Sequence, residues 1–259
     1  MHVSAQKNNW HQRWQVVLEH ILRIETEPVL DQLLASLKQT KAPLVLAFVN
    51  AHAMNSIVHS TEFFDAIKSA DVVVRDGSGM ATLYNMLGVS PGLNLNGTDL
   101  IPRIMRSFDG KKIALYGTQK PFLGNAQNQI NKELAPGSEI VIEHGFHQAE
   151  TYLTHSQKYR PSLIVLGMGM PKQEQVAVQL RAAINFPCLI VCGGAIIDFL
   201  GGKTSRAPQW MRSLGIEWLY RLVLEPRRLF KRYVIGNPLF LIFALRFKTV
   251  QRRKLTHSE

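Results

Sequence analysis

The sequence predicts an α/β protein with a doubly wound, mostly parallel sheet, followed by a helical and basic C-terminal appendage. Short apolar runs rich in β-branched residues alternate with segments of helical spacing. Several runs are apolar at successive positions, which is typical of strands buried on both faces of a sheet. Alternation of such strands with helices indicates a sheet covered by helices on both sides.

The apolar runs give the expected order of the elements. The expected strands are residues 43–50, 71–76, 112–117, 139–143, 162–167 and 188–193. The expected helices are residues 55–69, 78–87, 99–107, 121–134 and 172–184. Residues 1–205 are expected to form the core, with 1–40 as a helical lead-in, and residues 206–259 the appendage.

Composition and charge limit the class of protein. The chain has 259 residues, of which 46% are hydrophobic and 19% charged, so a sizeable core is expected and wholesale disorder is excluded. From Arg206 onward, twelve Lys and Arg face three Asp and Glu, so this segment carries +9 of the net +11. Such a basic segment indicates an anionic partner: a membrane surface, a nucleic acid or the phosphates of a substrate.

Two features bear on the compartment. Cys188 and Cys192 lie in one apolar run and are interpreted as reduced core thiols, which favours a cytoplasmic location. Residues 1–14 are polar, so no secretory signal is expected. The most apolar stretch, residues 239–247, is too short to span a membrane as a simple helix and follows Asn237-Pro238.

Polar and glycine-rich segments follow the predicted strands, where a doubly wound sheet binds its ligands. Asp76 ends one strand, and its carboxylate could take a proton from an acceptor hydroxyl, or could merely cap the next helix. Gln173 and Asp198 follow two further strands and could bind a phosphate or a ribose or sugar hydroxyl, although plain turn packing is the alternative. The segment Asn96-Gly97-Thr98-Asp99 is first of all interpreted as a turn followed by a helix, with Thr98 or Asp99 as the cap.

Two common nucleotide and metal motifs are absent from the sequence. The third glycine of a dinucleotide-binding fingerprint after Gly167 and Gly169 would fall at Lys172, so that fingerprint is not formed. No Asp-x-Asp occurs, and His52 and His59 make no ligand set, so neither a metal nor a cofactor is expected. Helix amides and Arg or Lys would then meet a diphosphate.

Aromatic residues are interleaved with basic ones after Arg206. Trp210, Trp218 and Tyr233 are examples, and this composition suits a membrane interface. A helical hairpin with a solvated basic face and a nucleic-acid surface are the alternatives.

Several motifs in order resemble those of the WecG/TagA/CpsF glycosyltransferase family over about three-quarters of the chain. These motifs are Asn50, Asp76-Gly77-x-Gly79, Gly97-Thr98-Asp99-Leu100, Gly167-x-Gly169-x-Pro171-Lys172-Gln173-Glu174, Gly193-Gly194-Ala195 with Asp198, Gly201-Gly202-Lys203-x-x-Arg206-Ala207-Pro208, Leu214-Gly215-Ile216-Glu217-Trp218-Leu219-Tyr220-Arg221-Leu222 and Glu225-Pro226-x-Arg228. The resemblance implies a Rossmann-like fold and an inverting, metal-independent transfer. The sugar would pass from a UDP-sugar to a polyprenyl-diphosphate-linked sugar in bacterial cell-surface polysaccharide synthesis.

The resemblance also implies roles for individual residues. Asp76 is the implied base, and Phe146 lies where the family has an aromatic residue beside uracil. The implied donor-binding set is Asn50, Gly77, Gly79, Asn96, Asp99, Gly117, Phe146, Gly167, Gly169, Lys172, Gln173, Gly193, Gly194 and Asp198. The implied appendage cations are Arg206, Arg221, Arg228 and either Arg232 or Lys231.

Asn94 and Phe48 depart from the family pattern at the sugar end of the donor, so the donor sugar stays open. An enzyme peripheral to the inner face of the cytoplasmic membrane is expected, with no nucleic-acid partner; a homo-oligomer is compatible with the sequence. The rival readings are an NAD-dependent nucleotide-sugar epimerase or dehydrogenase, and a non-catalytic basic module that binds membranes or nucleic acids.

Overall fold

The computed structural model describes residues 10–256, with side chains described to residue 251. Its centre is a six-stranded sheet in the order β2-β1-β6-β5-β3-β4, and every adjacent pair is parallel. The strands are β1 (Pro43–Val49), β2 (Val72–Arg75), β3 (Ile113–Gly117), β4 (Ile140–Glu143), β5 (Leu163–Gly167) and β6 (Cys188–Cys192). This arrangement confirms the predicted parallel α/β fold.

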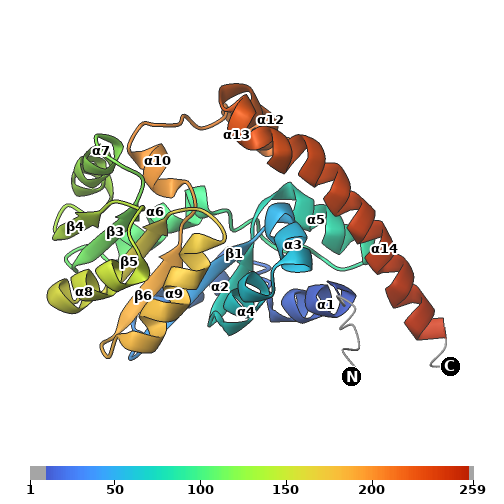
Figure 1. Ribbon diagram of the computed structural model, residues 1–259, viewed down its shortest axis with the longest axis horizontal. Helices are drawn as coiled ribbons and strands as arrows, with labels where there is room; N and C mark the ends of the chain where they lie inside the picture. Colours follow the sequence, from blue (N-terminus) through green and yellow to red (C-terminus); the bar gives the residue numbers. More distant parts are fainter. Residues whose placement is uncertain (1–9, 257–259) are drawn as a thin grey trace, which may run out of the picture.

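Helices cover both faces of the sheet (Figure 1). One face carries α1 (Trp10–His20), α3 (Ala51–His59), α4 (Thr61–Ser69), α5 (Gly77–Met86), α8 (Ala149–Tyr159) and α9 (Lys172–Ala183). The other face carries α2 (Glu27–Lys38), α6 (Gly97–Ser107), α7 (Phe122–Gln129), the π-helical turn η1 (Ile130–Leu134) and α10 (Ile196–Leu200). Cys188 and Cys192 are free and buried between the layers, as expected.

Two helices differ from the prediction. The single helix expected over residues 55–69 is two helices, because Ser60 accepts a hydrogen bond from the Phe63 amide and starts α4 as an N-cap. Helix α8 was not predicted. It buries only Tyr152 and Ser156, so its sequence carries a weak amphipathic pattern.

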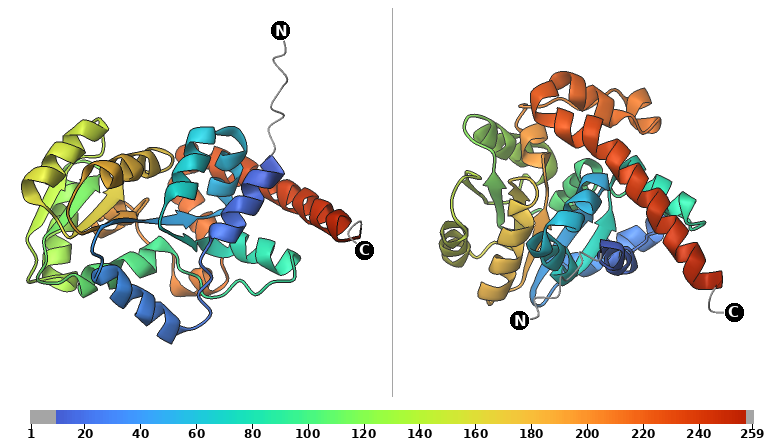
Figure 2. Two further views of the ribbon diagram at one scale, coloured as in Figure 1. Left: turned by 90° about the horizontal axis from the view of Figure 1, so that it is seen from below. Right: turned by 45° about the vertical axis from the view of Figure 1, so that its right-hand side comes forward.

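The appendage consists of α11 (Gln209–Ser213), α12 (Glu217–Leu224), α13 (Pro226–Phe230), the π-helical turn η2 (Lys231–Ile235) and α14 (Gly236–Thr256). The last three follow one another without a gap and form one long helix that runs along the body (Figure 2). Pro238 does not break this helix. In the wider π turn just before Pro238, the Gly236 amide donates to the Lys231 carbonyl oxygen, five residues earlier. This turn shifts the hydrogen-bonding register at the point where proline has no amide to donate.

Helix α14 shares the core of the body. Phe240, Ala244 and Phe247 are buried, and the rings of Phe240 and Phe247 lie 5.6 and 5.8 Å from that of Trp14 in α1. No helix long enough to span a membrane was expected, and this expectation is wrong. Because the helix continues through Pro238, residues 226–251 are long enough and apolar enough to cross a membrane, by length and composition only. A helix that packs one face on a protein body passes the same criteria, and 28% of its most apolar window is buried.

Candidate active site

Asp76 ends β2 at the carboxyl edge of the sheet, beside the end of β1. Its side chain does not cap α5, so the simple capping role considered for it is not the one the structure shows. Instead, the carboxylate accepts a hydrogen bond from Asn50 Nδ2 at 3.2 Å. Asn50 is held in turn by its own oxygen, which accepts from the Ala53 amide at 3.1 Å as the N-cap of α3. The two predicted residues therefore form one fixed pair.

The surroundings of Asp76 favour a proton acceptor of increased basicity. Burial raises the pKa of the Asp76 carboxyl, while the hydrogen bond from Asn50 and the positive charges of Arg232, Arg221 and Arg75 oppose that rise. A carboxylate with a raised pKa that is still held ionised by cations is suited to general-base chemistry.

Arg75, directly before Asp76, was not singled out by the sequence. Its guanidinium donates to the carbonyl oxygens of Pro91 at 2.5 Å and Gly92 at 2.7 Å, and only 5% of the residue is exposed. Asn94, one of the departures from the family pattern, accepts from the Gly77 amide at 2.9 Å. Arg75 and Asn94 thus fix the segment next to Asp76 from the β2 side.

The appendage brings arginines to the same corner. Arg221 and Arg232 both act on Asp76 electrostatically, and Arg232 is also close to His52 and Arg228. Burial lowers the pKa of Arg232. Lys231, the alternative third cation, is exposed. The geometry therefore favours Arg232 over Lys231.

Several arginines in this region keep unused donors. Among the described residues, buried side-chain nitrogens without a hydrogen-bond partner occur on Arg206, Arg212, Arg221 and Arg232. Buried donors that lack a partner carry a free-energy cost, which a bound anion would relieve. Arg228 differs, because it forms two hydrogen bonds with Glu225, at 2.5 and 2.7 Å.

Gln173 lies behind the donor loops. Its Oε1 accepts from the amides of Gly169 at 3.2 Å and Gly194 at 2.9 Å, and its Nε2 donates to Glu174 at 2.8 Å. Only 1% of Gln173 is exposed. In this conformation Gln173 ties two glycine loops together, and those two amides are not free for a phosphate.

Glu174 is a second buried group that sequence reasoning did not single out. It is 1% exposed, and its Oε2 has no hydrogen-bond partner in the described part of the chain. Burial raises its pKa to about 7. Glu174 thus holds the Gln173 side chain in place by accepting a hydrogen bond from its Nε2.

The glycines of these loops fall into two groups. Gly169 and Gly194 have φ of 80° and 59°, and a Cβ at either would meet no atom within 4 Å, so they shape the backbone and leave open space for a ligand. Gly117 and Gly167 instead lie against each other, since a Cβ on Gly117 would be 2.5 Å from the Gly167 oxygen. Close packing of the chain explains the second pair.

Asp198 meets the end of β3. The Thr118 hydroxyl donates to Asp198 at 2.5 Å, and Lys203 Nζ lies 3.2 Å from the same carboxylate oxygen. Thr118 has φ of 43°, which is rare for a β-branched residue and is typical of backbone strain at a functional site. Arg228 of the appendage also acts on this corner, since the charge of Asp198 raises the Arg228 pKa, after the larger effect of Glu225.

The segment after β4 carries Phe146, which is 69% exposed. Lys172 Nζ donates to the carbonyl oxygens of Gly145 at 2.9 Å and His147 at 2.8 Å, so Lys172 holds this segment rather than facing open space. Phe146 is thereby presented to solvent at the same edge of the sheet as Asp198.

One group of possible metal ligands was missed from the sequence. Glu143, His144 and His147 offer ligand atoms within 4.8 Å of one another. The two imidazoles are stacked with centroids 3.8 Å apart and an interplanar angle of 22°. Because a metal binds in the plane of each ring, both rings cannot hold one ion without a rotamer change. The absence of a metal therefore stays a prediction.

The start of α6 closes the other side of the edge. Asn96, and not the expected Thr98 or Asp99, caps this helix by accepting from the Asp99 amide at 3.0 Å. Asp99 pairs with Arg206 at 2.6 Å. Burial alone would raise the pKa of Asp99, but the hydrogen bonds from Arg206 and Asn96 outweigh burial and lower that pKa. Gly79 packs against Ala51, since a Cβ there would lie 3.0 Å from the Ala51 Cβ.

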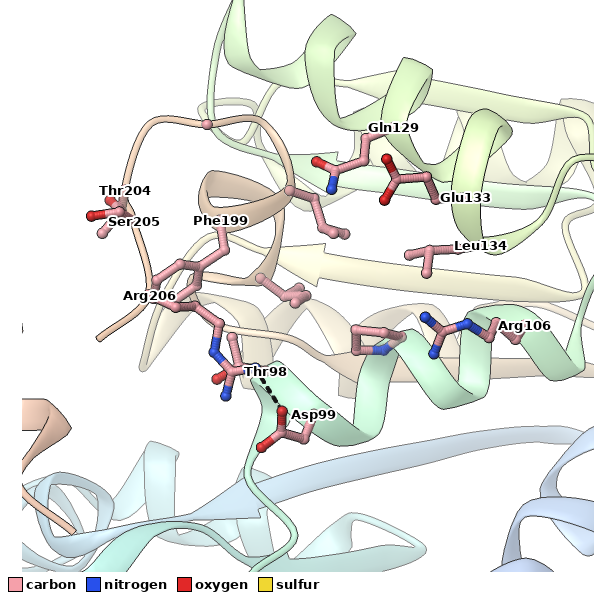
Figure 3. Close-up of a pocket in the computed structure, with 14 residues that line it drawn as sticks. Thr98, Asp99, Arg106, Gln129, Glu133, Leu134, Phe199, Thr204, Ser205 and Arg206 are labelled. Atoms are coloured by element: carbon pink, nitrogen blue, oxygen red, sulfur yellow. Dashed lines mark hydrogen bonds and ion pairs between the residues drawn. The ribbon is translucent and has the colours of Figure 1, made fainter. Parts of the chain in front are cut away.

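A cavity of about 530 Å³ begins at this ion pair and continues along α6 (Figure 3). Phe199 and Leu134 contribute apolar surface, and Arg106 and Glu133 lie at the end distant from Arg206 (Figure 3). Asp76 does not line it. The cavity is thus separate from the residues around Asp76 and was not predicted.

Comparisons of the sequence with known proteins found one family model and several similar enzymes. The family model described as glycosyl transferase WecG/TagA/CpsF family matches residues 15–254. A Bacillus subtilis (strain 168) protein named N-acetylglucosaminyldiphosphoundecaprenol N-acetyl-beta-D-mannosaminyltransferase is 27% identical over 193 residues, or 73% of this chain and 74% of that protein. A Staphylococcus aureus (strain MRSA252) protein of the same name is 26% identical over 200 residues, or 74% and 76%.

Proposed function

The chain belongs to the WecG/TagA/CpsF glycosyltransferase family, and from this membership we propose an inverting, metal-independent transfer of a sugar from a UDP-sugar to a polyprenyl-diphosphate-linked sugar. The relatives named above use an N-acetylglucosaminyl-diphosphoundecaprenol acceptor, which supports the acceptor class. The observation that carries the proposal is the half-buried Asp76–Asn50 pair, close to appendage arginines that keep buried nitrogens without a hydrogen-bond partner.

The site divides into two halves along the sheet. The ends of β3, β4, β5 and β6 carry Phe146, Gly169, Gly194 and Asp198, and this half would hold UDP. The ends of β1 and β2 carry Asn50 and Asp76 and lie under the appendage, so this half would receive the acceptor. The reacting sugar would lie where the halves meet.

In this arrangement Asp76 removes the proton of the acceptor hydroxyl. The oxygen forms a bond to the anomeric carbon from the face opposite UDP, and the bond from that carbon to the UDP oxygen breaks. A single displacement inverts the anomeric centre. Arg221 and Arg232 stabilise the negative charge that develops on the departing diphosphate, because they lie in a poorly solvated corner where such interactions are strong.

The outer face of the appendage supports a membrane location. Leu241, Ile242 and Leu245 of α14 are 43%, 48% and 57% exposed, and Phe230 is 52% exposed. Apolar surface beside basic residues is typical of helices that lie in the interfacial region of an anionic leaflet. Since the opposite face of α14 packs on the body, we propose peripheral attachment through this outer face, on the inner side of the cytoplasmic membrane.

Transfer is tested with a panel of UDP-sugars and a short-chain prenyl-diphosphate-linked N-acetylglucosamine, with and without excess EDTA. Turnover with one donor, unchanged by EDTA and giving an inverted linkage, is the expected result. Turnover that EDTA abolishes and Mg²⁺ restores would overturn metal independence, and no turnover with any UDP-sugar would overturn the donor class.

Attachment is tested by flotation with vesicles that contain anionic phospholipid. Substitution of Leu241, Ile242 and Leu245 by serine should weaken binding by roughly two orders of magnitude, because burial of the exposed half of each side chain contributes about 1 kcal/mol and every 1.4 kcal/mol is tenfold in affinity. A matched change of exposed residues on another helix, such as Val29→Ser in α2, should leave binding unchanged. Equal binding by all forms would remove α14 from the attachment surface. Arg252, Arg253 and Lys254 were expected to add to vesicle binding, and their side chains lie outside the described residues.

A further inference from the structure

His52 is a polar side chain close to Asp76, and its imidazole has no hydrogen-bond partner among the residues that the structure describes. It is the second residue of α3 and follows Asn50 by two positions, at the carboxyl edge of β1. Within the described part of the chain its imidazole forms no hydrogen bond; only its carbonyl oxygen is used, by Ser56 Oγ at 2.9 Å. The residue is half-buried, so its ring is neither sealed in the core nor fully solvated.

The side of α3 that bears His52 faces the appendage. Asn55, three residues later and hence on the same side, donates from Nδ2 to the Gly236 carbonyl at 2.7 Å. Gly236 begins α14, and Arg232 is one turn before it in η2. Arg232 acts electrostatically on both His52 and Asp76, so the three side chains lie in the same region of the molecule.

The protonation state of His52 in this region is set by its neighbours. Burial and the positive charge of Arg232 lower its pKa to about 4. The imidazole is therefore neutral under assay conditions and offers one N–H donor and one acceptor nitrogen. A neutral donor–acceptor pair beside a base and a cation fits a sugar hydroxyl rather than a phosphate.

We propose that His52 binds the acceptor sugar and fixes the orientation of its attacking hydroxyl toward Asp76, an inference that rests on the proposed glycosyl transfer. The acceptor is favoured over the donor because His52 follows β1, two residues after the Asn50 that bonds Asp76, whereas the donor loops follow β3 to β6. His52 is thus a specificity residue for the sugar that is joined directly to the lipid diphosphate.

The test compares His52→Leu, which keeps apolar volume, with His52→Gln, which keeps hydrogen-bonding capacity. Loss of one hydrogen bond should raise the KM for the short-chain acceptor roughly 3–10-fold in His52→Leu and less in His52→Gln. Calorimetric affinity for UDP should change less than about two-fold in both. Binding of the acceptor in the presence of UDP, also measured by calorimetry, should weaken in parallel with KM.

His59→Ala is the matched control, since His59 ends the same helix and is exposed. It should leave every parameter unchanged. The proposal is overturned if His52→Leu binds and uses the acceptor as the parent does, or if it loses UDP affinity instead. The pH–rate profile should keep its shape in His52→Gln; a lost limb would make His52 a proton-transfer group rather than a binding group. A parent protein that binds the acceptor but transfers no sugar would contradict the proposed function and leave the acceptor-binding result for His52 standing.

Discussion

The two halves of the candidate site differ in how their polar groups are satisfied. In the donor half, Gln173 and Lys172 form hydrogen bonds with the backbone of neighbouring loops, and the Thr118 hydroxyl donates to Asp198. In the appendage corner, Arg221 and Arg232 keep buried nitrogens without partners. The first half is held in shape by the protein itself, whereas the second is left for a ligand to complete.

The most severe change should be Asp76→Asn, because it removes the proton acceptor from the corner that a ligand completes. We expect kcat to fall by about 10² or more, as is usual for a general base, with UDP affinity within a few-fold of the parent. Steady-state kinetics and UDP calorimetry measure both. Asp65→Asn, on exposed α4, is the control. Near-normal turnover by folded Asp76→Asn would exclude Asp76 as the base.

Arg232→Ala should reduce activity less than Asp76→Asn does, since other arginines remain nearby. Loss of one charged hydrogen bond corresponds to about 1.5–3 kcal/mol, so kcat/KM should fall about 10–100-fold. Arg232 also lowers the Asp76 pKa, so the acid limb of the pH–rate profile should move to higher pH in the variant. Lys231→Ala, at the exposed neighbouring position, should do neither. Equal losses in both variants would mean that the appendage contributes only general positive charge.

This replaces a simpler expectation about the appendage. The sequence suggested that deletion from Arg221 onward would leave the core folded. The structure makes that unsafe, because Phe240, Ala244 and Phe247 belong to the core and their loss would expose the partners of Trp14. Single substitutions at Arg221 and Arg232 separate the catalytic role from the structural one.

Gln173→Ala should act on the donor half through its shape. The sequence suggested a greater effect on UDP affinity than on stability. From the structure we expect the opposite order, because the variant leaves the half-buried amides of Gly169 and Gly194 without their partner and the two loops untied. We expect a loss of about 1–3 kcal/mol in the free energy of unfolding, with weaker UDP binding as a consequence. Denaturant unfolding and calorimetry measure the two. Unchanged stability with lost affinity would make Gln173 a direct ligand.

Glu174→Gln should give the smallest effect, and one that depends on pH. The folded pKa of Glu174 is about 7 against an ordinary 4.5, so this residue lowers stability as pH rises through that interval. Glutamine cannot ionise. The melting temperature of the variant relative to the parent should therefore rise between about pH 5 and about pH 8. Parallel melting curves across that range would show that Glu174 stays neutral or is already paired.

The fold was predictable from sequence because continuous apolar runs report burial on both faces directly. All six strands lie within one or two residues of the predicted runs. Helix α8 was missed because it buries few residues and so shows little amphipathic pattern. The continuation of the last helix through Pro238 was missed because it depends on a π turn, which no sequence pattern predicts.

The site was predictable to the level of which loops meet, since strand ends of a parallel sheet share one edge. Residue roles were less accessible. Lys172 and Gln173 look like ligands in sequence but form hydrogen bonds with neighbouring loops in the structure, while no separate role was predicted for His52 or Glu174. Whether a polar side chain faces a ligand or its own backbone is decided by tertiary contacts, which local spacing does not encode.

The aromatic contact between the first and last helices couples the two ends of the chain to catalysis. Trp14 donates from Nε1 to the Met54 carbonyl of α3 at 2.9 Å and also packs on Phe240. Because α14 continues into η2, which carries Arg232, we expect a displacement of α14 by a bilayer or by an alteration of α1 to move Arg232 as well. A substitution in α1 that disturbs Trp14 would thus change the electrostatic environment of Asp76, far from the substituted residue.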